Sequence, residues 1–277
     1  MSPVDPRPAG PVAVRVAAVI PARMASSRFP GKPLLALAGL PMIEHVRRRA
    51  LLCRRFSEVV VATCDEAIAE AVRGCGGRCV MTSPAHPAAT DRVAEAAARL
   101  DCTHVVNIQG DEILVLPGDL ERMVQAIEAE PGVPAWNAVA RIERPEELSD
   151  PSIVKAAVSR SGRILYCARD FSALAAREAE ALEGLRKILG VLGYRRDFLE
   201  RYGRLARTPL EIAGSIDQSR IIEHDVLLRA VEFSKGFPSI NEPREVEVVA
   251  ACLEQDPAQQ ALLQAIAAEG RQRQAVG

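Results

Sequence analysis

Three cations in one short segment are the residues of this chain that most clearly indicate chemistry. Arg23, Arg28 and Lys32 lie five and four residues apart, with small residues between them and Gly31 directly before the lysine. Small residues let backbone N–H groups approach a ligand, and glycine reaches backbone angles that other residues resist. Backbone N–H donors and several cations together suit a polyphosphate. We therefore interpret residues 19–34 as a phosphate-binding loop, with a solvated basic loop as the alternative.

A second chemical signal is the sequence Gln109-Gly110-Asp111-Glu112. It follows the apolar run from His104 to Ile108, which has the pattern of a buried strand. A carboxylate just past such a strand is placed to hold Mg²⁺ against the phosphates of a nucleotide triphosphate. We expect Asp111 to ligate Mg²⁺, which is the only cofactor that the sequence predicts. A turn that carries a solvated acid is the alternative.

The elements that must position these two segments alternate between strand and helix. Apolar runs predict strands at residues 12–20, 59–63, 79–81 and 104–108, and helical patterns lie between them at 42–52, 66–73 and 90–100. Such alternation predicts βαβ units and a parallel sheet. Ligands of these sheets bind at the carboxyl ends of the strands. The cation loop and Asp111 would then share one edge of the sheet.

The second half of the chain has a different pattern. The segments 153–158 and 164–169 predict a hairpin across Ser161-Gly162. Helices are expected at 119–130, 173–189, 210–223 and 245–267, and strands at 190–194 and 226–233. We expect a flexible tail over residues 1–13, a single domain over 14–256 and a helical, frayed tail over 257–277.

The composition argues against several classes of protein, namely nucleic-acid-binding, membrane-spanning and exported proteins. The 277 residues are 48% hydrophobic and 26% charged, as in ordinary soluble domains. A net charge of −1 argues against a nucleic-acid partner, and no apolar run is long enough to span a membrane. The first residues lack the apolar core of a signal peptide. The seven cysteines are scattered and odd in number, which suits reduced thiols and predicts a cytoplasmic protein.

From Val14 to Leu253 the chain resembles the CMP-Kdo synthetases, the 3-deoxy-manno-octulosonate (Kdo) cytidylyltransferases. The family opens with Ile-Pro-Ala-Arg-x-x-Ser-x-Arg-x-Pro-Gly-Lys-Pro-Leu, which residues 20–34 reproduce. Further family positions are Val61-Ala62-Thr63, Thr90-Asp91-Arg92, Asn107 to Glu112, Lys155, Tyr166 and Arg169. The resemblance implies an α/β fold of the nucleotide-diphospho-sugar transferase type, with one domain and a mostly parallel mixed sheet. It also implies a homodimer that transfers CMP from CTP to a small anionic acceptor and releases pyrophosphate.

The same resemblance assigns roles to individual residues. Arg23, Lys32 and Asp111 would be the catalytic residues. The nucleotide would be bound by Ala22, Arg23, Ser26, Arg28 and Lys32, with Arg92 and Gln109 holding the cytidine. Asp111 would ligate the metal. The acceptor would be bound by Lys155, Tyr166, Arg169, Asp217 and Gln218.

The acceptor side departs from the family. Its Ser-Gly before Thr-Glu-Arg is here Ala88-Ala89, its His-Leu-Gly is residues 188–190, and the Asp that is its second metal ligand aligns with Asn241. A sugar hydroxyl needs a metal to lower its pKa before it attacks, whereas a phosphonate oxygen is already anionic at neutral pH. Neutral Asn241 therefore favours a phosphonate acceptor such as phosphonoformate, as in antibiotic biosynthesis.

Three alternatives remain beside the phosphonate cytidylyltransferase. The first is CMP-Kdo synthesis for lipopolysaccharide. The second is a sugar-1-phosphate nucleotidyltransferase, which shares the fold and a Gly-Lys-Pro loop but fits Arg23 and the Gln-Gly-Asp sequence less well. The third is a non-catalytic CTP-binding regulator that lost turnover together with the carboxylate that Asn241 replaces.

Overall fold

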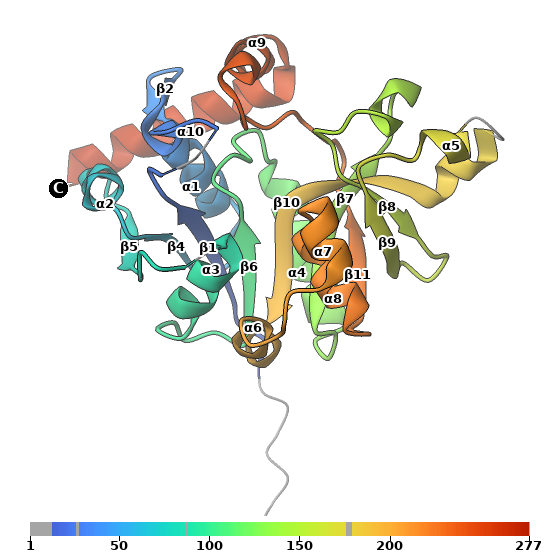
Figure 1. Cartoon of the computed structure of the whole chain (residues 1–277). Coiled ribbons are helices and arrows are strands. Elements are labelled where there is room, and N and C mark those ends of the chain that lie inside the picture. The colour runs from blue at the N-terminus through green and yellow to red at the C-terminus, as the bar shows by residue number, and fades with distance from the viewer. Residues whose placement is uncertain (1–12, 26–27, 87, 176–178, 277) are drawn as a thin grey trace, which may run out of the picture.

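A nine-stranded mixed sheet crosses the molecule, and the computed structural model describes residues 13–25, 28–86, 88–175 and 179–276 around it (Figure 1). The strand order is β11-β7-β10-β6-β1-β4-β5, with β8 paired to β10 and β9 paired to β8. The strands are β1 (Val16–Ala22), β4 (Glu58–Thr63), β5 (Arg78–Met81), β6 (His104–Ile108), β7 (Ala135–Arg141), β8 (Lys155–Val158), β9 (Ile164–Ala168), β10 (Leu185–Arg195) and β11 (Leu228–Glu232). A separate two-stranded sheet joins β2 (Ala36–Leu37) and β3 (Leu40–Pro41).

The first four strands of the large sheet are parallel. β1 pairs with β4 and β6, and β4 pairs with β5, all in parallel register. β10 then runs antiparallel to β6, β7 and β8, whereas β11 is parallel to β7. The expected α/β fold with a mixed, mostly parallel sheet is confirmed, and so is the β8–β9 hairpin.

Helices cover both faces of the sheet because its strands are apolar on both sides. Along β1, Val16, Ala18 and Ile20 belong to one core, and Ala17 and Val19 belong to the other. The first core is completed by α1 (Met42–Leu52), α2 (Glu66–Gly74), α4 (Pro117–Ala129) and α9 (Val246–Gln255). The second is completed by α3 (Ala89–Ala97), α6 (Arg196–Tyr202) and α8 (Asp217–Glu223), with α7 (Pro209–Gly214) beside α8 (Figure 1).

Three helix predictions are wrong in part, and one of them is the helix expected over 245–267, which is interrupted at Asp256 between α9 and the next helix. The helix expected over 173–189 is limited to α5 (Ser172–Ala175) and a 3₁₀ turn at Ala179–Gly184, and β10 starts at Leu185. Residues 185–187 pair with β8, and this long-range pairing overrides the local helical pattern. The helix expected over 210–223 is divided into α7 and α8, because Ser215 between them adopts a left-handed conformation (φ 50°).

The C-terminal segment forms α10 (Pro257–Val276), which contacts α1 and α9. The side chain of Gln259 is buried and donates to the carbonyl of Leu114 at 2.8 Å, and Ile266 is buried as well. Most of the tail predicted at the N-terminus, residues 1–12, lies outside the described residues. None of the helices in the described part of the chain combines the length and the apolar character needed to cross a bilayer.

Candidate nucleotide site

The cation loop leaves the carboxyl end of β1, where the sequence placed it. The amide of Met24 donates to Oδ2 of Asp65 at 2.8 Å, so the start of the loop is fixed to the end of β4. The amide of Gly31 donates to the carbonyl of Met24 at 3.0 Å and closes the loop. Gly31 has φ 77°, a conformation that favours glycine. Ser26, predicted to bind the nucleotide, lies outside the described residues.

Lys32 connects the loop to two other segments. Its Nζ donates to Oδ2 of Asp111 at 2.9 Å and to the carbonyl of Ile240 at 2.8 Å. Arg28 extends to Oδ1 of Asn241 at 3.5 Å. The expected meeting of the cation loop with Asp111 is thus present, and the segment around Asn241 joins them at the same edge of the sheet.

A cavity of about 100 Å³ lies beside this cluster, at the end of β1. It is lined by Pro21, Ala22, Arg23, His86, Ala88, Ala89 and Arg92, which include three of the predicted nucleotide-binding residues. Arg92 is buried and donates to Thr82 Oγ1 at 2.5 Å, so its position is fixed. The sequence prediction did not include His86, whose Nε2 lies 2.6 Å from a carboxylate oxygen of Glu95.

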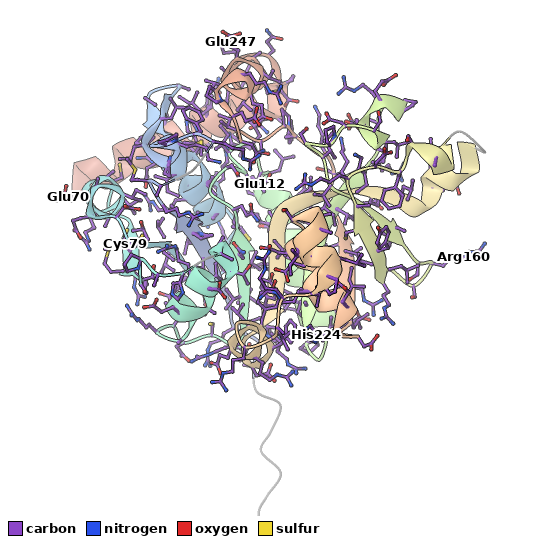
Figure 2. The ribbon with its side chains drawn as sticks, viewed as in Figure 1. Glu70, Cys79, Glu112, Arg160, His224 and Glu247 are labelled. Carbon is purple, nitrogen blue, oxygen red and sulfur yellow. The ribbon has the colours of Figure 1, made fainter. Side chains whose placement is uncertain are left out.

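Glu112 is a second side chain that the sequence prediction left without a role. It follows Asp111 in the turn after β6, and Figure 2 marks it near the centre of the molecule. Its Oε1 accepts a hydrogen bond from the amide of Gly190 at 2.7 Å. Burial and the neighbouring charge of Asp111 raise the pKa of this carboxyl to about 7. The turn that carries Gln109 and Asp111 is therefore bonded directly to β10.

The structure gives Lys155 a buried position beside the β8–β9 hairpin, and its predicted part in acceptor binding stays a prediction. The side chain is fully buried, and Nζ donates to the carbonyls of Asp150, Ile153 and Arg169 at 2.6, 3.0 and 2.5 Å. An ammonium group has three donors, and all three are used here. In this structure Lys155 thus fixes the ends of the β8–β9 hairpin and has no donor left for an acceptor.

The other predicted acceptor residues lie where β9 meets α8. Tyr166 is half exposed on β9, whereas the guanidinium of Arg169 donates to the carbonyls of Pro151, Gly214 and Ser215. Burial raises the pKa of Asp217, and Gln218 donates to Oδ1 of Asn137 at 2.8 Å. Their role in acceptor binding stays a prediction.

Comparison with known proteins decides the family. The family model described as Cytidylyltransferase matches residues 17–231. The chain belongs to the cytidylyltransferase family. Similar curated proteins are the 3-deoxy-manno-octulosonate cytidylyltransferases of Myxococcus xanthus (42% identical, covering 86% of this chain and 96% of the relative) and Escherichia coli (36%, covering 88% and 98%). A solved CMP:2-keto-3-deoxy-manno-octonic acid synthetase complexed with CTP is 34% identical, with a TM-score of 0.81, and the match covers 87% of this chain and 99% of that one.

These relatives confirm the predicted enzyme class, a CTP-dependent nucleotidyltransferase, and CTP as a substrate. They give no support to a phosphonate acceptor, because the similar curated proteins are named for 3-deoxy-manno-octulosonate. The same fold also occurs in proteins of much lower sequence identity. A solved cytidylyltransferase from Leptospira borgpetersenii is 16% identical to this chain and has a TM-score of 0.61.

The carboxylate of Asp111 could hold a metal ion together with the phosphate oxygens of a bound nucleotide. In the described ranges, no group of three or more His, Cys, Asp or Glu side chains could hold a metal by itself. Mg²⁺ in nucleotide sites is usually held by one or two carboxylates together with phosphate oxygens and waters. Asp111, partly exposed beside the cation loop, fits that requirement as a single protein ligand.

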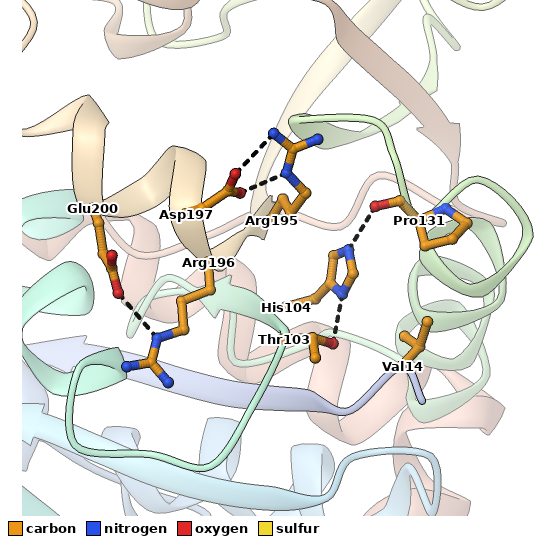
Figure 3. Close-up of a pocket in the computed structure, with 8 residues that line it drawn as sticks. All are labelled: Val14, Thr103, His104, Pro131, Arg195, Arg196, Asp197 and Glu200. Atoms are coloured by element: carbon orange, nitrogen blue, oxygen red, sulfur yellow. Dashed lines mark hydrogen bonds and ion pairs between the residues drawn. The ribbon is translucent and has the colours of Figure 1, made fainter. Parts of the chain in front are cut away.

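A larger hollow of about 560 Å³ lies at the opposite end of the strands, where β6 begins and β10 ends (Figure 3). Two arginines line it, but both are ion-paired: Arg195 with Asp197 at 2.5 Å, and Arg196 with Glu200 at 3.0 Å. The charge of these guanidinium groups is therefore already compensated. The cytidylyltransferase presents its predicted triphosphate ligands at the other edge.

Proposed function

We propose that this cytidylyltransferase transfers CMP from CTP to a sugar acid of the 3-deoxy-manno-octulosonate type and releases pyrophosphate. The observation that carries the proposal is the meeting of Lys32 with Asp111 and with the carbonyl of Ile240, beside Arg28. Relatives that are 36–42% identical and covered over nearly their full length support the sugar acid as acceptor. A homodimer, with CTP and the sugar acid as ligands, belongs to the same proposal.

The reaction is attack of an acceptor oxygen on the α-phosphorus of CTP. A new P–O bond forms, the bond between the α-phosphorus and the β-phosphate oxygen breaks, and pyrophosphate leaves while the acceptor hydroxyl gives up its proton. Such transfers depend on positioning and on stabilisation of phosphate charge. Arg28 and Lys32 would hold the triphosphate, and Arg23 and Arg92, which line the adjacent cavity, would hold the nucleotide beside it.

Asp111 is the proposed protein ligand of Mg²⁺. Once bound, the ion would neutralise phosphate charge and favour ionisation of the acceptor hydroxyl. The part that this chain supplies is the carboxylate itself, to which Lys32 donates at 2.9 Å. Arg28 would meet the phosphate as a planar, bidentate donor and Lys32 as a point charge.

The test is pyrophosphate release from CTP with Kdo, with phosphonoformate and without acceptor. We expect release with Kdo and Mg²⁺, and a background rate without acceptor. Release with phosphonoformate but not with Kdo would show that the acceptor is a phosphonate and not the sugar acid. CTP binding with no release under any acceptor would indicate the non-catalytic regulator instead. Turnover when sugar 1-phosphates are added to the panel would indicate the sugar-1-phosphate nucleotidyltransferase.

One observation favours the phosphonate as a second candidate. The amide oxygen of Asn241 is the group that faces Arg28. A carboxylate at this position would neutralise the guanidinium, whereas the neutral amide leaves its charge available to a ligand. A phosphonate brings more negative charge than a sugar carboxylate and would gain more from that cation.

A further inference from the structure

Gly190 marks the place where β10 changes its neighbours. From Val191 onward β10 pairs with β6, whereas residues 185–187 pair with β8. The pairing with β7 shifts register between Ile188 and Leu192. The residues around Gly190 therefore join the part of the sheet that contains β6 and the proposed nucleotide site to the β8–β9 hairpin.

Both main-chain polar groups of Gly190 are bonded to the turn that follows β6. Its carbonyl accepts from the amide of Gln109 at 2.8 Å, and its amide donates to Oε1 of Glu112 at 2.7 Å. A Cβ at Gly190 would lie 2.7 Å from that same oxygen and 3.2 Å from Cβ of Gln109. A side chain at position 190 would displace the Glu112 carboxylate and press on Gln109, so glycine suits this close approach and Glu112 fills the space that it leaves.

The hydrogen bonds continue from this contact toward the predicted acceptor side. The carbonyl of Leu189 accepts from Nδ2 of Asn137 at 3.0 Å, and Oδ1 of Asn137 accepts from Gln218 at 2.8 Å. Asn137 is fully buried in β7, and Gln218 lies on α8. The turn with Gln109 and Asp111 is therefore connected through residues 189–190 to the helix that carries Gln218.

We propose that Glu112 is a positioning residue: by holding the amide of Gly190 it keeps Gln109 and Asp111 in register with β10, and thereby with Asn137 and Gln218. This inference rests on the proposed function, since it concerns the relative placement of nucleotide and acceptor. Glu112 does not need to touch either substrate for this role. Removing its carboxylate frees one side of the turn, and a displacement of about 1 Å at such a site can lower turnover about 100-fold.

The test compares Glu112→Ala with Glu112→Gln, which keeps an acceptor oxygen at the same reach. We expect kcat of the alanine variant to fall about 10- to 100-fold, with a change of less than about threefold in the Kd for CTP, and the glutamine variant to stay within about threefold of wild type. Glu70→Ala is the matched control, because Glu70 is exposed on α2, away from Glu112 (Figure 2). Equal loss in the glutamine and alanine variants, or wild-type kcat in a folded alanine variant, would overturn the proposal.

Hydrogen exchange gives a readout that does not depend on turnover. In the nucleotide-free protein, the amide of Gly190 should exchange at least about 10-fold faster in Glu112→Ala than in wild type, and Glu112→Gln should restore protection. Unchanged exchange would refute the contact. If the alanine variant does not fold, Glu112→Asp replaces it, because its shorter side chain withdraws the carboxylate from Gly190. This variant should show the same fall in kcat and the same loss of protection at the Gly190 amide. Absence of pyrophosphate release by wild type, with exchange behaving as expected, would reject the proposed function and leave the Glu112 contact intact.

Discussion

The ammonium group of Lys32 lies 2.9 Å from Oδ2 of Asp111, although 79 residues separate them in the chain. Both side chains are about 15% exposed, so the pair is accessible to a ligand without being fully solvated. A triphosphate that entered here would meet the lysine from the loop after β1 and the carboxylate from the turn after β6. The two opposite charges suit a nucleotide that arrives together with a cation.

Lys32→Ala should raise the Kd for CTP at least about 10-fold, because a charge-assisted phosphate contact is lost. Lys235→Ala is the matched control, since Lys235 is ion-paired with Asp256 on the surface and should leave CTP binding unchanged. Calorimetry measures both. If Lys32→Ala binds CTP with wild-type affinity, Lys32 does not contact the triphosphate.

Arg28→Ala should also weaken CTP binding and lower turnover. Arg28→Lys should remain impaired, because lysine does not reproduce the planar guanidinium that binds phosphate through two parallel hydrogen bonds. Binding isotherms and initial rates of the two variants test this. Full activity of the lysine variant would show that only the charge at this position matters.

Asp111→Asn should abolish Mg²⁺-dependent turnover and leave the fold intact, because this carboxylate lies past the end of β6 and not in the core. Circular dichroism checks the fold, and pyrophosphate release checks turnover. Chelation of the metal should stop the wild-type reaction and allow it to resume when Mg²⁺ is added back. An unfolded Asp111→Asn variant would mean that the side chain is structural.

Asn241→Asp should affect the two candidate acceptors differently. The new carboxylate would face Arg28 and neutralise part of its charge, which should lower any phosphonate turnover more than turnover of a singly charged sugar acid. Rates with Kdo and with phosphonoformate, measured on wild type and variant, give the ratio. Equal changes for both acceptors would contradict the electrostatic argument.

The lowered pKa of Glu211 predicts how the free energy of unfolding depends on pH. Burial opposes its charge, but hydrogen bonds from Arg220, Arg207 and the amide of Thr208 outweigh this and lower its pKa from 4.5 to about 2. A lowered pKa stabilises the folded state fully above pH 4.5 and loses that effect as pH falls toward 2, a change of roughly 3 kcal/mol. Denaturant unfolding of wild type and Glu211→Gln should differ at pH 7 and converge near pH 2; a constant difference would contradict the assignment.

The sequence predicts the nucleotide half of the site because that half follows from a general property of parallel sheets. The loop after β1 and the turn after β6 both lie at carboxyl ends of neighbouring strands, so Lys32 and Asp111 meet once the strand order is known. Local patterns are sufficient to place each strand. No knowledge of the second half of the chain is needed for this meeting.

The role of Glu112 and the burial of Lys155 are not predictable in that way. Both depend on β10, which enters the sheet antiparallel between β6 and β7 and also pairs with β8. The residues before Gly190 have a helical pattern, and pairing over more than 40 residues of chain converts them into strand. Lys155 in turn fits the family motif, but only the hairpin geometry shows that its three donors are already used.

The contact of Gln259 with Leu114 gives α10 a part in the architecture of the edge that carries Asp111. The amide of Gln259 holds a carbonyl that lies two residues after Glu112, across 145 residues of chain. Further along α10, Ile266 is buried as well, and the helix contacts α1 and α9. The segment that follows Asp111 and Glu112 therefore depends on a hydrogen-bond donor from the carboxyl-terminal helix.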